Sequence, residues 1–221
     1  MIALDHLVIA AATRAEGAVW CERRFGITPA AGGRHVFMGT HNVLFSVASE
    51  RFPKAYAEII AIDPSGAVPA RPRWFDLDDA ALRSALQADG PHLVHWVARS
   101  PAIEIRSEVL RSCGIEPGEL ITAERGTLRW RIGLRADGKR LFGGALPALI
   151  EWGDAHPSEQ LPAGDVELLE LQLTGLPEAL ITALGGVPGV CAYPGAGIAP
   201  IRVRLRGPRG EVALASWQGA G

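Results

Sequence analysis

The feature that most constrains the fold is a pattern that occurs twice along the chain. An apolar strand with one interior histidine, His6, is followed 52 residues later by an apolar strand with one interior glutamate, Glu58. The same order returns with His95 and, 56 residues later, Glu151. A carboxylate inside an apolar strand is costly to bury unless it is paired or binds a cation. The repeated spacing therefore indicates a duplicated unit and a metal site shared by its two copies.

The two copies also agree in the order of their predicted elements. Residues 1–63 read as a strand, a helix over 14–25 and three further strands, and residues 91–157 read as a strand, a helix over 103–113 and three strands. The crossover 64–90 between them contains several prolines and a short helix. Two β-α-β-β-β units in tandem predict an α+β fold whose curved sheets lie side by side and form one cleft.

The remaining segment, 165–217, has strand and helix patterns of the same kind but no histidine and glutamate pair. Glu170 lies in its first predicted strand without a histidine partner. We expect a partial third unit that packs on the outside of the same domain, where it covers a sheet edge or shapes the pocket.

Composition places the chain among ordinary globular proteins, with 48% hydrophobic and 21% charged residues. Its net charge of −2 argues against a nucleic-acid partner. The sequence contains no apolar run of the roughly 20 residues that span a bilayer, and it begins directly with a strand rather than a signal peptide. The cysteines Cys21, Cys113 and Cys191 lie far apart, as expected for a protein of the reducing cytoplasm.

Several short motifs resemble those of the bacterial glyoxalase-like domain proteins, within the vicinal oxygen chelate superfamily that also includes bleomycin resistance proteins and dioxygenases. They include Leu-Asp-His-Leu-Val-Ile-Ala, Met-Gly-Thr-His-Asn, Arg-Pro-Arg-Trp-Phe, His-Trp-Val-Ala-Arg and Leu-Ile-Glu-Trp. The resemblance runs from Ile2 to about Trp217, and its specificity lies in the order and spacing of the motifs.

This resemblance implies a cleft that binds one divalent ion through His6, Glu58, His95 and Glu151. Two imidazoles and two carboxylates suit Zn²⁺, Ni²⁺, Co²⁺ or Mn²⁺. The implied activity is that of a metal-dependent lyase or isomerase, in which the ion binds vicinal oxygens of a small substrate and Glu58 or Glu151 moves a proton. The expected partner is a small-molecule substrate, and the existence of a homodimer is left open.

Three further side chains are candidates for substrate binding. His35 and His41 flank a predicted tight hairpin, and Arg125 lies near a strand rich in arginine. We expect them to line the cleft and bind an acidic or oxygen-rich molecule. The alternative is that the histidines are polar loop residues and the arginines a solvated face. His156, which precedes a proline in a loop, is expected to be exposed.

Two other functions remain open. A small-molecule binding or sequestering protein would use the same scaffold without catalysis, but four intact ligand positions count against it. A ring-cleaving Fe(II) dioxygenase needs two histidines and only one carboxylate. The presence of both Glu58 and Glu151 disfavours that assignment.

Overall fold

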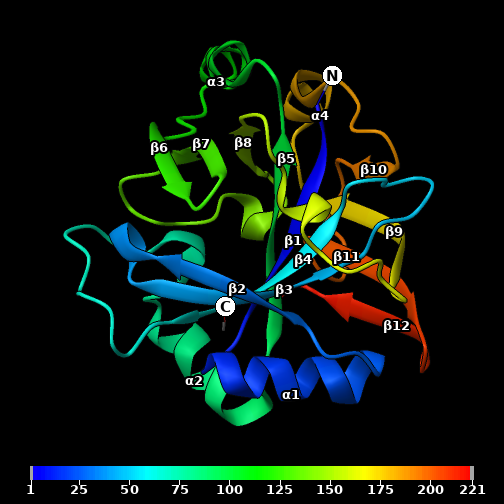
Figure 1. Cartoon of the computed structure of the whole chain (residues 1–221). Coiled ribbons are helices and arrows are strands. Elements are labelled where there is room, and N and C mark those ends of the chain that lie inside the picture. Colours follow the sequence, from blue (N-terminus) through cyan, green and yellow to red (C-terminus); the bar gives the residue numbers. More distant parts are fainter. Residues whose placement is uncertain (1, 220–221) are drawn as a thin grey trace.

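The computed structural model describes residues 2–219, and its centre is a curled sheet of eight strands in the order β2-β3-β4-β1-β5-β8-β7-β6 (Figure 1). The first four strands in this order belong to the first predicted unit and the last four to the second. The predicted α+β architecture with repeated β-α-β-β-β units is therefore confirmed.

The first unit begins with the elements that the sequence pattern predicts. The Thr13 hydroxyl accepts a hydrogen bond from the backbone N–H of Glu16 and caps α1, and Gly26 ends the helix in a left-handed conformation, with φ 78°. The elements of this unit are β1 (Ala3–Ala10), α1 (Arg14–Phe25), β2 (Ala30–His35), η1 (Val36–Met38), β3 (Thr40–Ser46) and β4 (Tyr56–Ile62).

The second unit follows the crossover, which contains a 3₁₀ turn and a helix, η2 (Trp74–Asp76) and α2 (Ala80–Asp89). Asp79 caps α2 by accepting the backbone N–H of Leu82. The elements of the second unit are β5 (His92–Arg99), α3 (Ile103–Ser112), β6 (Glu119–Arg125), β7 (Leu128–Leu134), η3 (Phe142–Gly144) and β8 (Ala148–Trp152).

The two units meet where β1 and β5 pair antiparallel at the centre of the sheet. Each of these strands pairs on its other side, in parallel, with the last strand of its own unit. The β1–β5 pairing contains two β-bulges, one at Asp5 and one at Val94, each immediately before a histidine. A bulge re-aims the side chains next to it and leaves one residue out of the ladder. The duplicated units therefore repeat a bulge as well as a histidine.

The C-terminal segment forms a second sheet of four strands in the order β10-β9-β11-β12. The first of these strands in the sequence, β9, pairs in parallel with β10 and antiparallel with β11. In each of the two units, by contrast, the first strand pairs in parallel with the last strand of that unit. It thus has the element order of a unit but not its pairing. Its elements are η4 (Pro157–Glu159), which precedes it, β9 (Glu167–Thr174), α4 (Glu178–Leu184), β10 (Val190–Tyr193), β11 (Ile201–Gly207) and β12 (Gly210–Ala215).

The second sheet packs on one face of the large sheet. Leu7 and Ile9 of β1 share a core with Leu168 and Leu171 of β9. The opposite face of the large sheet forms a separate apolar cluster that includes Val8, Trp74 and Trp130. Because successive strand residues point to opposite faces, the even-numbered residues of β1 after the bulge face this second cluster, and the candidate site lies there.

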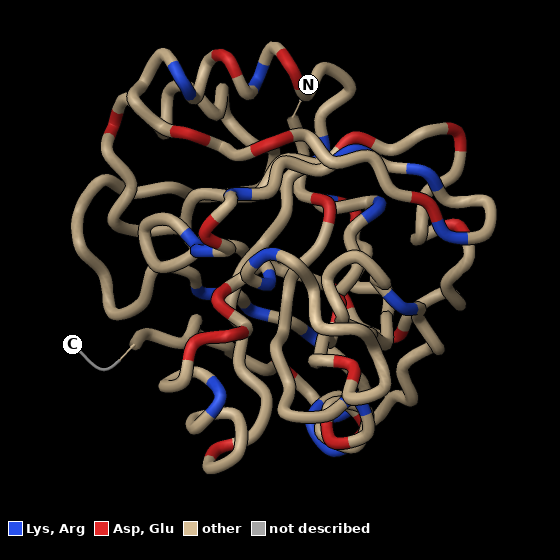
Figure 2. The backbone as a smooth tube through the Cα atoms, turned by 90° about the vertical axis from the view of Figure 1, so that its left-hand side faces the viewer, with Lys and Arg blue, Asp and Glu red and all other residues tan. Residues whose placement is uncertain are grey.

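Charged residues of both signs are interspersed along the backbone, as Figure 2 shows. None of the helices within residues 2–219 is long and apolar enough to cross a membrane.

Candidate functional site

Three titratable side chains of the first unit meet on the inner face of the large sheet. His6 projects from β1, Glu58 from β4 and His35 from the end of β2, and each is more than nine-tenths buried. They line one small pocket together with Asn42 and Tyr56. Predicted metal ligands His6 and Glu58 are thus neighbours, and His35 lies with them.

The orientation of His6 depends on the bulge at Asp5. Because the bulged residue lies outside the regular alternation, the Asp5 carboxylate reaches Nδ1 of its neighbour His6 at 2.7 Å. Its second oxygen binds Nε2 of His156 at 2.9 Å and accepts the indole N–H of Trp152 at 3.0 Å. Burial opposes the charge on Asp5, but the hydrogen bonds from His156 and His6 outweigh it and hold the Asp5 pKa well below its usual range.

This carboxylate fixes the orientation of the His6 ring. A carboxylate at Nδ1 makes that nitrogen the donor and turns Nε2 toward Glu58. Nε2 lies 3.7 Å from an oxygen of Glu58, too far for a hydrogen bond. Tyr56 stacks on the ring, with 4.7 Å between centroids. Burial raises the pKa of the Tyr56 hydroxyl well above its ordinary value, so the phenol is neutral.

His35 faces Glu58 in a similar way. Its Nδ1 lies 3.1 Å from the hydroxyl of Thr40, and its Nε2 lies 3.8 Å from the other oxygen of Glu58. Burial lowers the pKa of His35 to about 4, although the Glu58 charge opposes this change. Asn42 donates its side-chain N–H to the same Glu58 oxygen and accepts the backbone N–H of Gly33. The imidazoles of His6 and His35 therefore lie on either side of one oriented carboxylate.

Arg125 joins this pocket from the opposite edge of the sheet. Its side chain lies so close to Gly33 of β2 that a Cβ there would be 2.3 Å from the arginine Cδ. Since β2 and β6 are the two edge strands, this contact shows that the sheet curls until its edges meet. The Nη1 atom of Arg125 is buried without a hydrogen-bond partner. Arg125 thus lines the pocket as expected and keeps a free donor there.

We predict that Gly32→Ala disrupts the orientation of Glu58. A Cβ at Gly32 would lie 2.0 Å from the side-chain oxygen of Asn42, which would have to move and release its bond to Glu58. Overpacking of this kind costs about 1–3 kcal/mol. Urea denaturation should show that loss. Gly126→Ala serves as the control for backbone strain alone. A Cβ at Gly126 meets nothing within 4 Å, but the backbone there has φ +58°.

The crossover closes the pocket with an aromatic wall. Trp74 and Phe75 both line it, and Phe75 and Asp76 have left-handed backbones, each with φ 59°. Two consecutive non-glycine residues in that region are strained. Arg140 holds the turn, because its Nε donates to the Asp76 carboxylate at 2.7 Å. The guanidinium also donates to the Val94 carbonyl at 2.6 Å.

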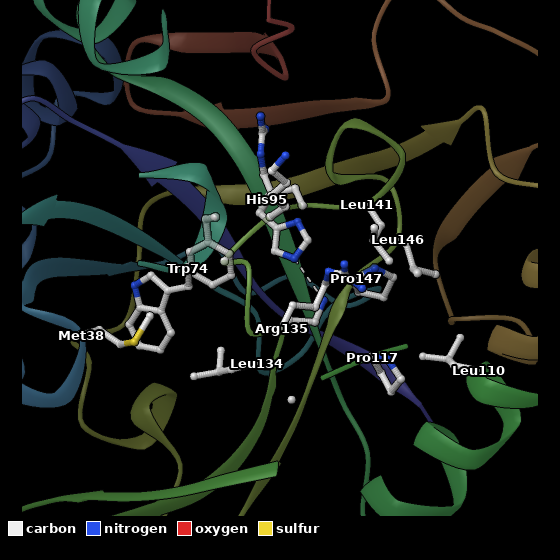
Figure 3. Close-up of a pocket in the computed structure, with 16 residues that line it drawn as sticks. Met38, Trp74, His95, Leu110, Pro117, Leu134, Arg135, Leu141, Leu146 and Pro147 are labelled. Atoms are coloured by element: carbon white, nitrogen blue, oxygen red, sulfur yellow. Dashed lines mark hydrogen bonds between the residues drawn. The ribbon is translucent and has the colours of Figure 1, made fainter. Parts of the chain in front are cut away.

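His95, the third predicted ligand, does not line the pocket of His6, His35 and Glu58. It faces the same side of the sheet as His6 but pairs with Val8, whereas His6 pairs with Val97. The Phe75 ring packs against it, with 5.0 Å between the ring centroids. Its Nε2 accepts the backbone N–H of Ala148 at 3.1 Å, so it lines a different pocket (Figure 3).

The buried His95 predicts a loss of stability in acid. Burial lowers its pKa from 6.5 to about 3, so between these values the unfolded chain binds a proton that the folded chain does not. Stability therefore falls as the pH decreases through this window, by about 1.4 kcal/mol per pH unit for one such group. His95→Leu should reduce that slope in urea denaturation series at pH 6.5, 5.5 and 4.5. An unchanged slope would show that the imidazole accepts its proton without unfolding.

Glu151, predicted as a metal ligand and proton carrier, lies on the opposite face of the sheet from the Glu58 pocket. Its neighbours in β8, Ile150 and Trp152, line the pocket, so alternation turns Glu151 away from it. The carboxylate instead pairs with Arg131, which also binds Glu104 of α3. Glu58 and Glu151 therefore occupy unrelated environments, and the expected four-ligand centre does not form.

Two more histidines differ from expectation. His41 alternates with Asn42 and so points away from the Glu58 pocket; it lines a separate cavity beside Arg14. His156, expected to be exposed, is only 6% exposed because it binds Asp5. The sequence reasoning also missed Asp5 and Asn42. A charged residue next to a histidine in an apolar strand was the available signal for Asp5.

Two imidazoles and one carboxylate are donor types that suit a divalent ion. Within residues 2–219, however, no group of three or more His, Cys, Asp or Glu side chains is placed so that it could hold a metal ion. The Nε2 atoms of His6 and His35 nonetheless face one carboxylate, at 3.7 and 3.8 Å from its two oxygens. Each ligand bond to such an ion is about 2.0–2.2 Å. The three side chains are not placed at that spacing in the structure.

Comparisons with known proteins agree with the fold. The family model of the glyoxalase-like domain matches residues 4–185. A hypothetical protein from Staphylococcus aureus is similar over 99% of this chain and 87% of its own, at 13% identity and a TM-score of 0.55, which shows a shared fold.

Two methylmalonyl-CoA epimerases are among the other similar structures. One, from Streptomyces coelicolor in complex with 2-nitronate-propionyl-CoA, covers 69% of this chain and 96% of its own at 14% identity and a TM-score of 0.45. The other, from Mycobacterium tuberculosis, covers 69% and 88% at 20% identity and a TM-score of 0.42. No curated protein sequence matches the chain. Because the family model spans most of its length, the chain belongs to the glyoxalase-like domain family.

Proposed function

We propose that the protein is a metal-dependent lyase or isomerase of the glyoxalase-like kind, whose site lies within the first unit. His6, His35 and Glu58 would hold one divalent ion. The observation that carries this proposal is the arrangement of two imidazole nitrogens and one carboxylate around a common pocket, at 3.7 and 3.8 Å. Lone pairs and a negative charge repel at this distance unless a cation or a proton lies between them.

The surrounding residues support the same assignment. Metal-binding histidines usually donate their second ring N–H to a carboxylate or another oxygen. His6 has Asp5 in that position, and His35 has Thr40. When bound, the ion would supply a Lewis acid that stabilises negative charge on a substrate oxygen.

The chain's own groups would bind the substrate and move its proton. Glu58 is the one carboxylate among the described residues that line the pocket, so it is the candidate proton acceptor. Asn42 holds one of its oxygens and thereby orients the other. The free Nη1 donor of Arg125 would bind an anionic or oxygen-rich end of the substrate. Trp74 and Phe75 would exclude water on the remaining side.

One observation favours a second candidate. With Glu151 on the other face, the donor set is two histidines and one carboxylate, the set that Fe(II) oxygenases use. Because Glu151 does not line this pocket, the presence of two glutamates no longer counts against a dioxygenase. Oxygen consumption by the Fe(II)-loaded protein in the presence of substrate would distinguish this reaction from proton transfer, which consumes no oxygen.

Elemental analysis of the protein purified without a metal-affinity tag tests the proposal. We expect about one divalent ion per folded chain, which dialysis against a chelator removes. His6→Ala should lose it, while His95→Ala, whose side chain lies beyond Phe75, should keep it. A folded wild-type protein that retains no ion, even after incubation with Zn²⁺, Mn²⁺, Ni²⁺, Co²⁺ or Fe²⁺, would refute the proposal and favour a binding or sequestering protein.

A further inference from the structure

A large cavity lies between α1 and α2, beside the residues that follow β1 (Figure 1). Its volume is about 570 Å³. Small-molecule sites usually have volumes of roughly 300–1,000 Å³. His41 of β3 lines this cavity and, by alternation with Asn42, lies on the opposite face of the strand from the Glu58 pocket. The cavity is therefore a site separate from the Glu58 pocket and large enough for a small molecule.

The cavity continues as an apolar groove between the two helices. A neighbouring hollow extends it along α1 as far as Arg23, and the residues that line both are Ala12, Ala15, Leu86 and Gln87. Val19 lines the extension and is 48% exposed, so apolar surface stays uncovered there. At the rise of an α-helix, the stretch of α1 from Arg14 to Arg23 is about 14 Å long. The groove is thus long and narrow, which suits an extended chain.

Two arginines without carboxylate partners line the cavity at one end of this groove. Arg14 and Arg83 are both in the lining, and neither forms an ion pair within residues 2–219. Burial lowers the pKa of His41, and the charge of Arg14 lowers it further, so this guanidinium lies near the histidine. None of the described lining residues of the cavity is acidic. The cavity therefore has a positive field with two unpaired guanidinium groups.

The carboxylate closest to this end of the groove is already paired. Asp63 lies 3.8 Å from Nδ1 of His41, but it is outside the lining and pairs with Arg34 at 2.8 Å. At the other end of the groove Glu16 and Arg23 carry opposite charges. The charge distribution therefore favours a ligand whose anionic end lies at Arg14 and Arg83 and whose apolar part lies along the groove.

We propose that the cavity and its groove bind a free fatty acid of medium chain length. The carboxylate pairs with Arg14 and Arg83, because the guanidinium fork matches the two oxygens of a carboxylate. The acyl chain runs past Ala15 and Leu86 to Val19 and covers their apolar surface. A single groove takes one chain, so a free fatty acid fits better than a phospholipid with two. The proposal does not depend on a metal or on any reaction at Glu58.

Methyl NMR of the full chain, titrated with sodium dodecanoate below its micelle concentration, tests this site. We expect saturable shifts of the Val19, Leu77 and Leu86 methyl groups, which all line the cavity or its extension. Dodecylammonium, which has the same chain and the opposite charge, should not cause them. Neither should acetate at the same concentration, because it lacks the chain.

Two changes in the lining should reduce binding. The double substitution Arg14→Gln with Arg83→Gln should weaken dodecanoate binding at least about tenfold, because it removes charged hydrogen-bond donors. Ala15→Trp, at an exposed helix position that lines both parts of the groove, should abolish binding by filling it.

Matched controls separate this proposal from the others. Arg24→Gln, in the same helix but in neither lining, should bind dodecanoate as the wild type does. Glu58→Gln should also leave this affinity unchanged, whatever its effect on metal. The proposal is refuted if dodecanoate causes no saturable shift of the three side chains, or if dodecylammonium binds equally well. It is also refuted if the double variant and Ala15→Trp bind with wild-type affinity, or if vesicles of phosphatidylglycerol cause the shifts and free dodecanoate does not.

Discussion

Glu58→Gln is expected to abolish metal retention, whereas Glu151→Gln leaves it unchanged. The first substitution removes the one carboxylate of the Glu58 pocket, and the second removes a carboxylate that pairs with Arg131 on the other face of the sheet. Loss of a supporting residue alone costs about 10–100-fold in metal affinity. Loss of a ligand should therefore cost more than about 100-fold. Elemental analysis after equilibrium dialysis measures the effect.

The paired design makes this result decisive. Both variants exchange a glutamate for an isosteric amide in a strand of the same sheet, so effects of the substitution itself are matched. Circular dichroism should show that both retain the fold. Loss of metal in Glu151→Gln with retention in Glu58→Gln would mean that the ion binds on the opposite face from the one proposed.

Asp5→Asn is expected to produce the largest loss of stability of any single change at the site. Asp5 is completely buried and binds His6, His156 and Trp152. The amide nitrogen of asparagine would face a donor where the carboxylate oxygen accepted one. Breaking a buried charged pair costs about 3–5 kcal/mol. Urea denaturation at pH 7 measures this loss, and Asp154→Asn, at an exposed position, should change stability by no more than about 0.5 kcal/mol.

The effect of Asp5 depends on pH in a defined direction. Its pKa is lower in the folded chain than the ordinary 3.8, so its contribution is complete above that value and is lost as the pH falls below it. The stability difference between the wild type and Asp5→Asn should therefore be constant from pH 5 to 7 and smaller in stronger acid. A difference that grows with acidity would show that the carboxyl group is protonated in the native state.

Much of the fold could be predicted from the sequence because its signals are local and repeated. Hydrophobic periodicity, the Thr13 cap and the Gly26 stop define α1, and the same periodicity gives the strands of both units. The neighbouring positions of His6 and Glu58 followed from the spacing within one unit. The pairing of the C-terminal strands did not follow, because element order alone does not determine which strands are adjacent.

The positions of His95 and Glu151 relative to the pocket could not be predicted, in part because the sequence pattern does not determine strand register. Whether Glu151 or its neighbours Ile150 and Trp152 face the pocket depends on a shift of one residue, which the sequence pattern leaves undetermined. The bulge at Asp5 and the insertion of Phe75 beside His95 are likewise tertiary features. Spacing indicates that the units are duplicated, but it does not determine which of the four predicted ligands face one pocket.

The central claim is that one unit alone provides the ligands, and anomalous diffraction tests it most directly. Crystals of the wild-type protein soaked in Co²⁺ should be measured at the cobalt absorption edge. We predict a single strong anomalous peak between the Nε2 atoms of His6 and His35 and the carboxylate of Glu58. A peak bound by His95 and Glu151, or one shared equally by the two units, would contradict the account.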